Sequence, residues 1–347
     1  MGKPLETVLE RIMTNAPRFR VLHIITPEQL AQARLAFNQL TIAGPDSGDL
    51  FFGAFGIGNV VDTIDRPYER FQDYETLLTV LKNDDPQKYA DLHKGTAFFF
   101  LGWTAFDLRD FERAVFYMDA ALSEDERKFP VPFEEFMKNP VGQFLRLELA
   151  GSQTGKRITK DLRDRMEEQL VRFATFSPSP QLDLQAFIGE FVMTIARTKD
   201  ARSIVTALYG FILEFEDRLQ MLRLRSKEGG SIEPLLTHLF KGGLIFESLL
   251  KQLDPGKKTL GEFNSVPQFL ADFPRFNTSA QSLTQIIQGI SDNSVQTAFN
   301  TTAKLRNTTG HNLVWDDVFN DPENFRKLYE QEMNAICYII QKKYLST

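Results

Sequence analysis

Most of the chain places apolar residues three and four positions apart, which is the spacing of one face of an α-helix. Few stretches alternate strictly between apolar and polar residues, as a half-buried strand would. The one candidate strand is the run RFRVLHII, from Arg18 to Ile25, and Pro27 just after it suits the start of a helix. The pattern therefore predicts an all-α protein.

Helical periodicity predicts four helices in the C-terminal half, over residues 182–226, 233–253, 279–305 and 321–344. At the start of the last one, Asp321 can cap the helix and Pro322 suits its first turn. Four helices joined by loops predict a bundle. Before them, the segment FSPSPQ at 176–181 carries two prolines at alternate positions, which prevent a helix from continuing. We place the domain boundary there, between a helical scaffold over 1–176 and a helical domain over 181–347.

The segment AFFFLGWTAFDLRDFERAVFYMDAAL, from Ala97 to Leu122, has a more specific spacing. In a tetratricopeptide repeat, two antiparallel helices pack with a small residue where they cross and large apolar residues between them. The matching positions are Leu101, Gly102, Phe111, Ala114, Tyr117, Ala121 and Leu122. Residues 95–125 thus resemble one such repeat, and an ordinary helical hairpin is the alternative. Because one repeat cannot bury its own face, its neighbours must be degenerate repeats or another helical scaffold.

Composition limits the classes of function. A chain of 347 residues suggests two or three domains. The formal charge of −6 argues against a general polyanion binder but leaves room for a local basic patch. A single cysteine, Cys337, excludes an internal disulfide and fits a reducing compartment, so we expect a cytoplasmic protein. No run of about 18 apolar residues is present, so no membrane insertion is expected.

Only four histidines occur, and they differ in their surroundings. His23 sits in the apolar run RVLHII, which favours a packed or partly exposed side chain over a functional one. His93 and His238 have no second histidine or cysteine at a metal-ligand spacing, and we interpret them as structural. His311 instead ends the string RNTTGH, which begins at Arg306 and lies between the third and fourth predicted helices. This string is therefore the strongest candidate for chemistry.

The string RNTTGH resembles the active-site motif of HEPN domains, in which an arginine and a polar residue precede a histidine just before the last helix. The resemblance covers about 182–347, and its only specific motif is this string. It implies an endoribonuclease that needs no metal and no cofactor, with Arg306, Asn307 and His311 as catalytic residues. It also implies RNA rather than DNA as substrate, and a homodimer in which two motifs form one composite site.

The chemistry of RNA cleavage explains these residue types. The 2′-hydroxyl attacks the adjacent phosphate, giving a cyclic phosphate and a 5′-hydroxyl. Histidine titrates near neutrality and can move the proton, while arginine can bind phosphate oxygens bidentately and stabilise the developing charge. By resemblance, such architectures belong to bacterial defence, as CRISPR-associated or toxin-like nucleases. The N-terminal region would then act as a sensor for a protein or small-molecule activator.

Two further expectations remain open. A basic cluster of Arg218, Arg223, Arg225 and Lys227 could guide RNA, although a solvated helix end with cations near its C-terminus is the commoner explanation. The main alternative function is a non-enzymatic adaptor that binds a protein partner and dimerises through the HEPN-like bundle. In that case Arg306 would cap a helix, and a backbone carbonyl would satisfy His311.

Overall fold

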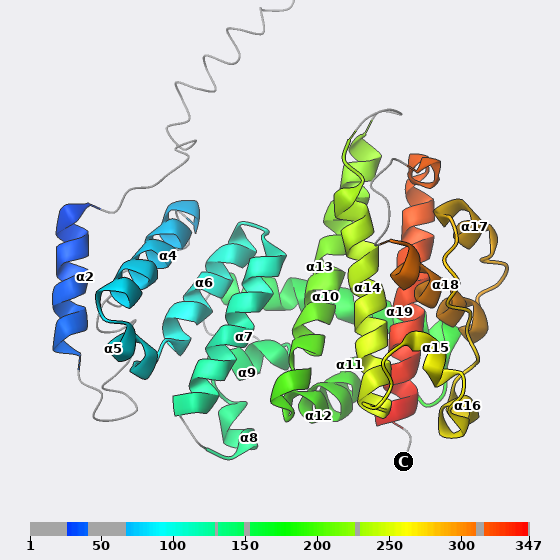
Figure 1. Ribbon diagram of the computed structural model, residues 1–347, viewed down its shortest axis with the longest axis horizontal. Helices are drawn as coiled ribbons and strands as arrows, with labels where there is room; N and C mark the ends of the chain where they lie inside the picture. Colours follow the sequence, from blue (N-terminus) through cyan, green and yellow to red (C-terminus); the bar gives the residue numbers. More distant parts are fainter. Residues whose placement is uncertain are drawn as a thin grey trace, which may run out of the picture. The chain divides into compact units, whose positions relative to one another are not determined.

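The computed structural model describes residues 26–40, 67–128, 131–148, 153–225, 230–309 and 316–345 (Figure 1). Every regular element within these ranges is a helix, so the predicted all-α fold class is confirmed. The chain divides into two compact units, Met1–Pro130 and Val131–Thr347. The candidate strand at Arg18 to Ile25, with His23, lies outside the described residues.

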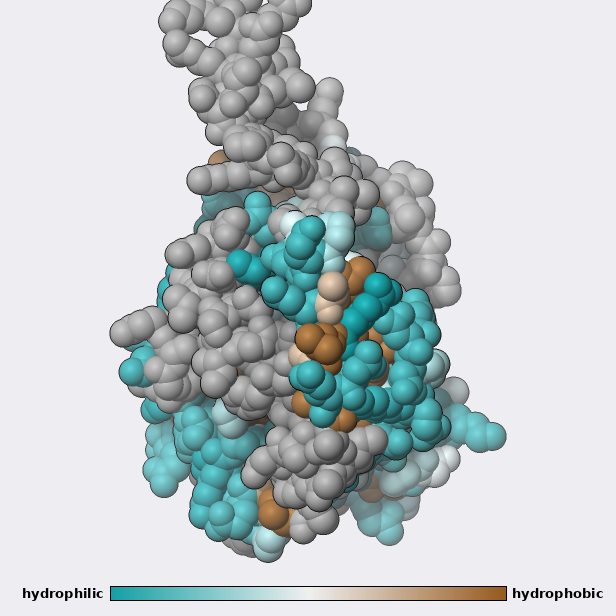
Figure 2. Space-filling view, turned by 90° about the vertical axis from the view of Figure 1, so that its left-hand side faces the viewer, coloured by the Kyte–Doolittle hydropathy of each residue, from teal (hydrophilic) through white to brown (hydrophobic). Residues whose placement is uncertain are grey.

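The described part of the first unit consists of helices whose starts the sequence specifies. Thr26 caps the first of them by accepting a hydrogen bond from the Gln29 amide, and Asp85 caps another through the Lys88 amide. Proline occupies the first turn after both caps. The helices are α2 (Pro27–Gln39), α4 (Pro67–Asp84), α5 (Pro86–Asp91), α6 (Gly95–Asp107) and α7 (Phe111–Lys128). Figure 2 shows that hydrophilic residues cover much of the described surface on the face it presents, with small hydrophobic patches between them.

Helices α6 and α7 form the hairpin that the spacing predicts. A β carbon on Gly102 would lie 2.9 Å from the Met118 methyl carbon and 3.3 Å from the Ala114 carbonyl oxygen, so the two helices cross at these small residues. Helix α4 packs beside α6, and the Tyr117 hydroxyl of α7 donates to Glu75 of α4 at 2.7 Å. The hairpin is thus observed, and its kinship with tetratricopeptide repeats stays a prediction.

The second unit begins before the boundary predicted at 176–181, because α10 packs against α13 and α19. The FSPSPQ segment is tied to the same unit, since the Ser177 hydroxyl donates to the buried Gln341 side chain at 2.7 Å. The α-helices of this unit are α8 (Phe133–Phe136), α9 (Pro140–Leu145), α10 (Gln153–Phe176), α11 (Leu184–Ala186), α12 (Met193–Ala196), α13 (Ser203–Leu224), α14 (Glu233–Leu253), α15 (Leu260–Phe263), α16 (Pro267–Asp272), α17 (Leu283–Gln288), α18 (Val295–Thr308) and α19 (Pro322–Tyr344). Short helices of other types are η2 (Phe187–Val192), η3 (Lys199–Ala201) and η4 (Asp317–Asn320).

Helices α13, α14, α18 and α19 pack together as the predicted bundle (Figure 1). Asp321 caps α19 by accepting from the Glu323 amide, and Pro322 occupies its first turn, as the sequence predicts. One apolar face of α19 is buried and includes Phe325, Leu328, Tyr329, Met333, Ile336 and Ile340. The core of this unit therefore lies where these four helices meet.

Two of the four predicted helices are shorter than expected. The helix expected over 182–226 is interrupted around Thr198, whose extended backbone starts the short turn η3 before α13. The helix expected over 279–305 is divided into α17 and α18. Between them, Ser294 caps α18 by accepting from the Thr297 amide, and Asp292 accepts from the Ser294 and Thr297 hydroxyls. Side-chain bonds to the backbone thus favour a new helix start over continuation.

Candidate functional site

The last turn of α18 places Arg306 and Asn307 beside α14. Thr309 caps the helix, and its hydroxyl donates to the Leu305 carbonyl at 2.8 Å. Gly310 and His311 follow immediately in the chain and lie outside the described residues, so the structure bears on two of the three expected catalytic residues.

Arg306 is held by a carboxylate on the neighbouring helix. Its Nε donates to Oε2 of Glu247 on α14 at 2.6 Å. The other carboxylate oxygen, Oε1, lies 2.7 Å from Nζ of Lys251, one turn further along α14. Two cations therefore share one carboxylate, and the cluster of Arg306, Glu247 and Lys251 keeps a net charge of about +1.

One edge of the Arg306 guanidinium is not occupied by Glu247. Nε takes the ion pair, whereas Nη1 has only a long 3.5 Å contact with Oδ1 of Asn307, and Nη2 has no hydrogen bond to another described residue. The guanidinium carbon also lies 5.8 Å from the centre of the Phe240 ring. The side chain is 33% exposed, so a phosphate could approach the Nη1/Nη2 edge from solvent.

Asn307 fastens the end of α18 to the segment before α17. Its Nδ2 donates to the Thr278 carbonyl at 2.6 Å, and the Thr308 hydroxyl donates to the Gln281 carbonyl at 2.9 Å. Both bonds hold the C-terminal turn of α18 in place. The described bonds of Asn307 are thus structural ones that orient the end of the helix from which the chain continues to His311.

The ionisation of Glu247 depends on its two cations. Burial favours the protonated form and raises its pKa, but the hydrogen bonds and charges of Lys251 and Arg306 outweigh burial and leave the pKa below its ordinary value. Glu247 is therefore an anion at neutral pH, and it fixes the direction in which Arg306 extends.

The described residues of the predicted basic cluster lie in the C-terminal part of α13 or just after it. Arg218 and Arg223 are on α13, and Arg225 follows its last residue, while Lys227 is outside the described residues. Arg225 Nη2 donates to Oδ1 of Asn320 at 2.7 Å, and Asn320 is the last residue of η4, two positions before α19. Arg225 thus contacts η4, which belongs to the connection between α18 and α19.

His93 and His238, which we interpreted as structural, are buried, and so is Cys337. His93 lies 2.7 Å from a carboxylate oxygen of Asp125, and Nε2 of His238 lies 2.8 Å from the Phe211 carbonyl oxygen. Cys337 is buried, which raises its thiol pKa to about 12. In the described part of the chain, no group of three or more His, Cys, Asp or Glu side chains could hold a metal ion. No described helix is long and apolar enough to span a bilayer.

Sequence reasoning did not find Glu247 or Lys251. A signal existed, because Glu247 is the only charged residue in the mainly apolar run LIFESLL, on a helix with a strong apolar face. A charged residue on a buried helix face requires a partner. The partner, Arg306, is distant in sequence, so the pairing becomes evident only once α14 and α18 are seen together.

No family model, curated protein or solved structure matches this chain.

Proposed function

We propose that this protein is a metal-independent endoribonuclease of HEPN type. The observation that supports it best is the cluster at the end of α18, where Glu247 anchors Arg306 through Nε and leaves the Nη1/Nη2 edge for a phosphate. Lys251 compensates the charge of Glu247, so the cluster keeps the positive charge that a phosphate needs.

In the proposed reaction, the 2′-oxygen of RNA attacks the adjacent phosphorus and the bond to the 5′-oxygen breaks. His311 moves the proton, and Arg306 stabilises the added negative charge on the phosphoryl oxygens. The products are a 2′,3′-cyclic phosphate and a 5′-hydroxyl. Asn307, tied to Thr278, keeps the end of α18 in a fixed position so that Arg306 and the chain leading to His311 stay together.

The wider setting is part of the same proposal. Two copies of the motif would meet across a twofold axis in a homodimer. The N-terminal region would respond to a protein or small-molecule activator and control cleavage, as in bacterial defence systems. The cations at the end of α13 would guide the RNA backbone towards the site. Sedimentation of the full chain tests the dimer directly.

Cleavage of a labelled, mixed-sequence RNA with EDTA present, and of DNA as a comparison, tests the activity. We expect RNA alone to be cut. His311→Ala should lower the rate about 100-fold or more, because it removes the proton-moving group. Arg306→Lys keeps the charge but removes the planar fork, and it should also be slow. Arg163→Lys, on the exposed surface of α10, is the matched control and should cut like the wild type. Undiminished cutting by pure His311→Ala would refute the proposed site.

A second candidate function, a non-enzymatic adaptor, is favoured by one observation. Arg306 and Asn307 already have partners in Glu247 and Thr278, as a purely structural role would require. In that case the wild type leaves RNA intact, and Arg306→Lys changes only the stability of the protein.

A further inference from the structure

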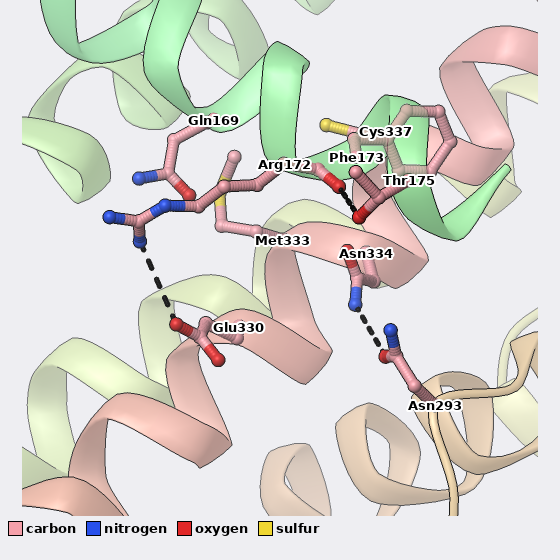
Figure 3. A pocket seen from close by; sticks show the side chains of 9 residues that line it. All are labelled: Gln169, Arg172, Phe173, Thr175, Asn293, Glu330, Met333, Asn334 and Cys337. Atoms are coloured by element: carbon pink, nitrogen blue, oxygen red, sulfur yellow. Dashed lines mark hydrogen bonds and ion pairs between the residues drawn. The ribbon is translucent and has the colours of Figure 1, made fainter. Parts of the chain in front are cut away.

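A hollow of about 250 Å³ opens between α10, α19 and the connection from α17 to α18 (Figure 3). It is distinct from the cluster around Arg306, with which it shares no residue. Its volume is below the roughly 300 to 1,000 Å³ of sites for drug-sized ligands. The hollow therefore suits a single ring system better than a peptide or a larger cofactor.

The apolar part of its lining is aromatic and sulfur-bearing. Phe173 of α10 and Met333 and Cys337 of α19 line it, and each is at most 3% exposed. Burial keeps the Cys337 thiol protonated, so this group offers a packing surface and not a nucleophile. Thioether and thiol sulfurs pack favourably on aromatic rings. This part of the lining suits the face of a planar heterocycle.

Three carboxamide side chains also line the hollow, and their hydrogen-bonding capacity is largely unused. Nδ2 of Asn334 donates to Oδ1 of Asn293 at 3.3 Å across the opening (Figure 3). This bond leaves the Asn334 carbonyl oxygen and the Asn293 amide without a bond to another described residue. Gln169 is 8% exposed, yet its side chain makes no hydrogen bond with any described residue. The three amides therefore offer donors and acceptors that a ligand in the hollow can use.

The charged groups of the hollow compensate one another. Arg172 lies 3.6 Å from Glu330 across the hollow and 2.5 Å from Glu168 on its own helix. Its guanidinium is thus engaged by two carboxylates, which leaves no excess positive charge for an anion. A neutral ligand with both donors and acceptors fits this lining better than a phosphate or a carboxylate.

We propose that this hollow binds an adenine base, presented as adenosine or as an adenine nucleotide whose phosphates remain outside. Carboxamides recognise adenine by accepting from its N6 amino group and donating to N7, whereas guanine is recognised by an arginine fork on O6 and N7. The three amides supply the donors and acceptors that adenine needs. Arg172 is paired with Glu168 and Glu330, so it is not free to recognise guanine. Packing on the sulfur-bearing lining adds affinity for the ring face. The proposal does not depend on the proposed ribonuclease activity.

Calorimetric titration of the full chain with adenosine tests this proposal, with guanosine, cytidine and ribose as comparisons. We expect saturable binding of adenosine with one site per chain, and weaker or no binding of the others. Gln169→Ala and Asn334→Ala should each weaken binding about tenfold, as expected for loss of a bidentate contact. Asn293→Ala changes an exposed residue between helices, so it should fold normally and weaken binding as well.

Asn38→Ala on the exposed surface of α2 is the matched control and should bind like the wild type. Three results would overturn the proposal: no binding of adenosine to the folded wild type, unchanged binding by all three variants of the hollow, or equally tight binding of guanosine. Circular dichroism of each variant shows that a loss of binding is not a loss of fold. Because no RNA is involved, failure here leaves the ribonuclease proposal untouched.

Discussion

A β carbon on Gly243 would lie 2.6 Å from the Cβ atom of Arg306 and 2.9 Å from its Cα atom. Helices α14 and α18 therefore meet at the level of the backbone at this point. The contact brings Glu247, one turn further along α14, within reach of Nε of Arg306. Gly243 thus allows the short distance between α14 and α18 on which the geometry of the candidate site depends.

Gly243→Ala should separate the two helices. The added methyl group meets backbone atoms that cannot rotate away, so we expect a loss of about 1 to 3 kcal/mol in the free energy of unfolding. RNA cleavage should fall as well, because the Arg306 to Glu247 distance changes. Thermal unfolding and the cleavage assay measure the two effects. Gly189→Ala is the control, since a β carbon there meets nothing within 4 Å. An unchanged melting temperature in Gly243→Ala would contradict the close contact.

The sequence predicted much of the fold because its signals are local. The apolar spacing of α14 and α19 and the cap at Asp321 lie within a few residues of the elements that they specify. The interruptions around Thr198 and between α17 and α18 were missed, because apolar spacing continues through them. Between α17 and α18, the side-chain bonds of Ser294 and Asp292 start a new helix, whereas at Thr198 the backbone becomes extended without a side-chain cap.

The candidate site was predictable in part. Arg306 and Asn307 stand out through their spacing from His311, whereas Glu247 belongs to a helix far away in sequence. Its role follows from the packing of α14 against α18, which no local pattern encodes. The hollow beside Cys337 was not predictable for the same reason, since it joins residues of α10, α19 and an interhelical connection.

Glu247 and Arg306 should be energetically coupled. Glu247→Gln removes the anion and leaves Arg306, which is two-thirds buried, without its ion pair, so we expect a loss of about 1 to 3 kcal/mol in stability. Arg306→Gln should cost a similar amount, and the double variant should cost less than the sum of the two. Urea unfolding of all four proteins measures the coupling. Strictly additive effects would show that the pair contributes nothing. Glu167→Gln, in an exposed pair on α10, is the control.

The same pair predicts a response to acid. Glu247 has a lowered pKa in the fold, so its contribution to stability is present above the ordinary glutamate pKa of 4.5 and is lost as the pH falls through its folded value. The stability difference between wild type and Glu247→Gln should therefore be largest near neutral pH and should shrink as the pH falls below 4.5 and through the folded pKa. A difference that grew on acidification would contradict this assignment.

Glu332 should lower the stability of the protein as the pH rises. Its carboxyl is fully buried on α19, and neither oxygen has a hydrogen-bond partner among the described residues. Burial raises its pKa well above 4.5, so the folded state keeps a proton that the unfolded state releases. Stability should fall by about 1.4 kcal/mol for each unit above pH 4.5, until the folded pKa is reached. Glu332→Gln cannot ionise and should lack this slope, which urea unfolding at several pH values measures. An identical slope in both proteins would contradict a protonated Glu332.

His238 should lower the stability of the protein as the pH falls, which is the opposite of the effect of Glu332. It is buried on α14, where its ring stacks on Phe211 at 4.4 Å and Nε2 donates to the Phe211 carbonyl. Burial lowers its pKa from 6.5 to about 3, so the unfolded chain takes up a proton at a pH where the folded protein does not. Stability should therefore fall by about 1.4 kcal/mol for each unit below pH 6.5, down to about pH 3.

Between pH 4.5 and 6.5 the effects of His238 and Glu332 should largely cancel, because one slope rises with pH and the other falls. The single variants separate them. Glu332→Gln leaves the contribution of His238, so its stability should rise with pH in this window, whereas His238→Gln leaves that of Glu332 and should fall. Urea unfolding at three pH values within the window is sufficient. Each variant is compared with the wild type, so that the pH dependence of the other titratable groups cancels. If the stability of both variants changed with pH in the same way, at least one of the two side chains would titrate in the folded protein at its ordinary pKa.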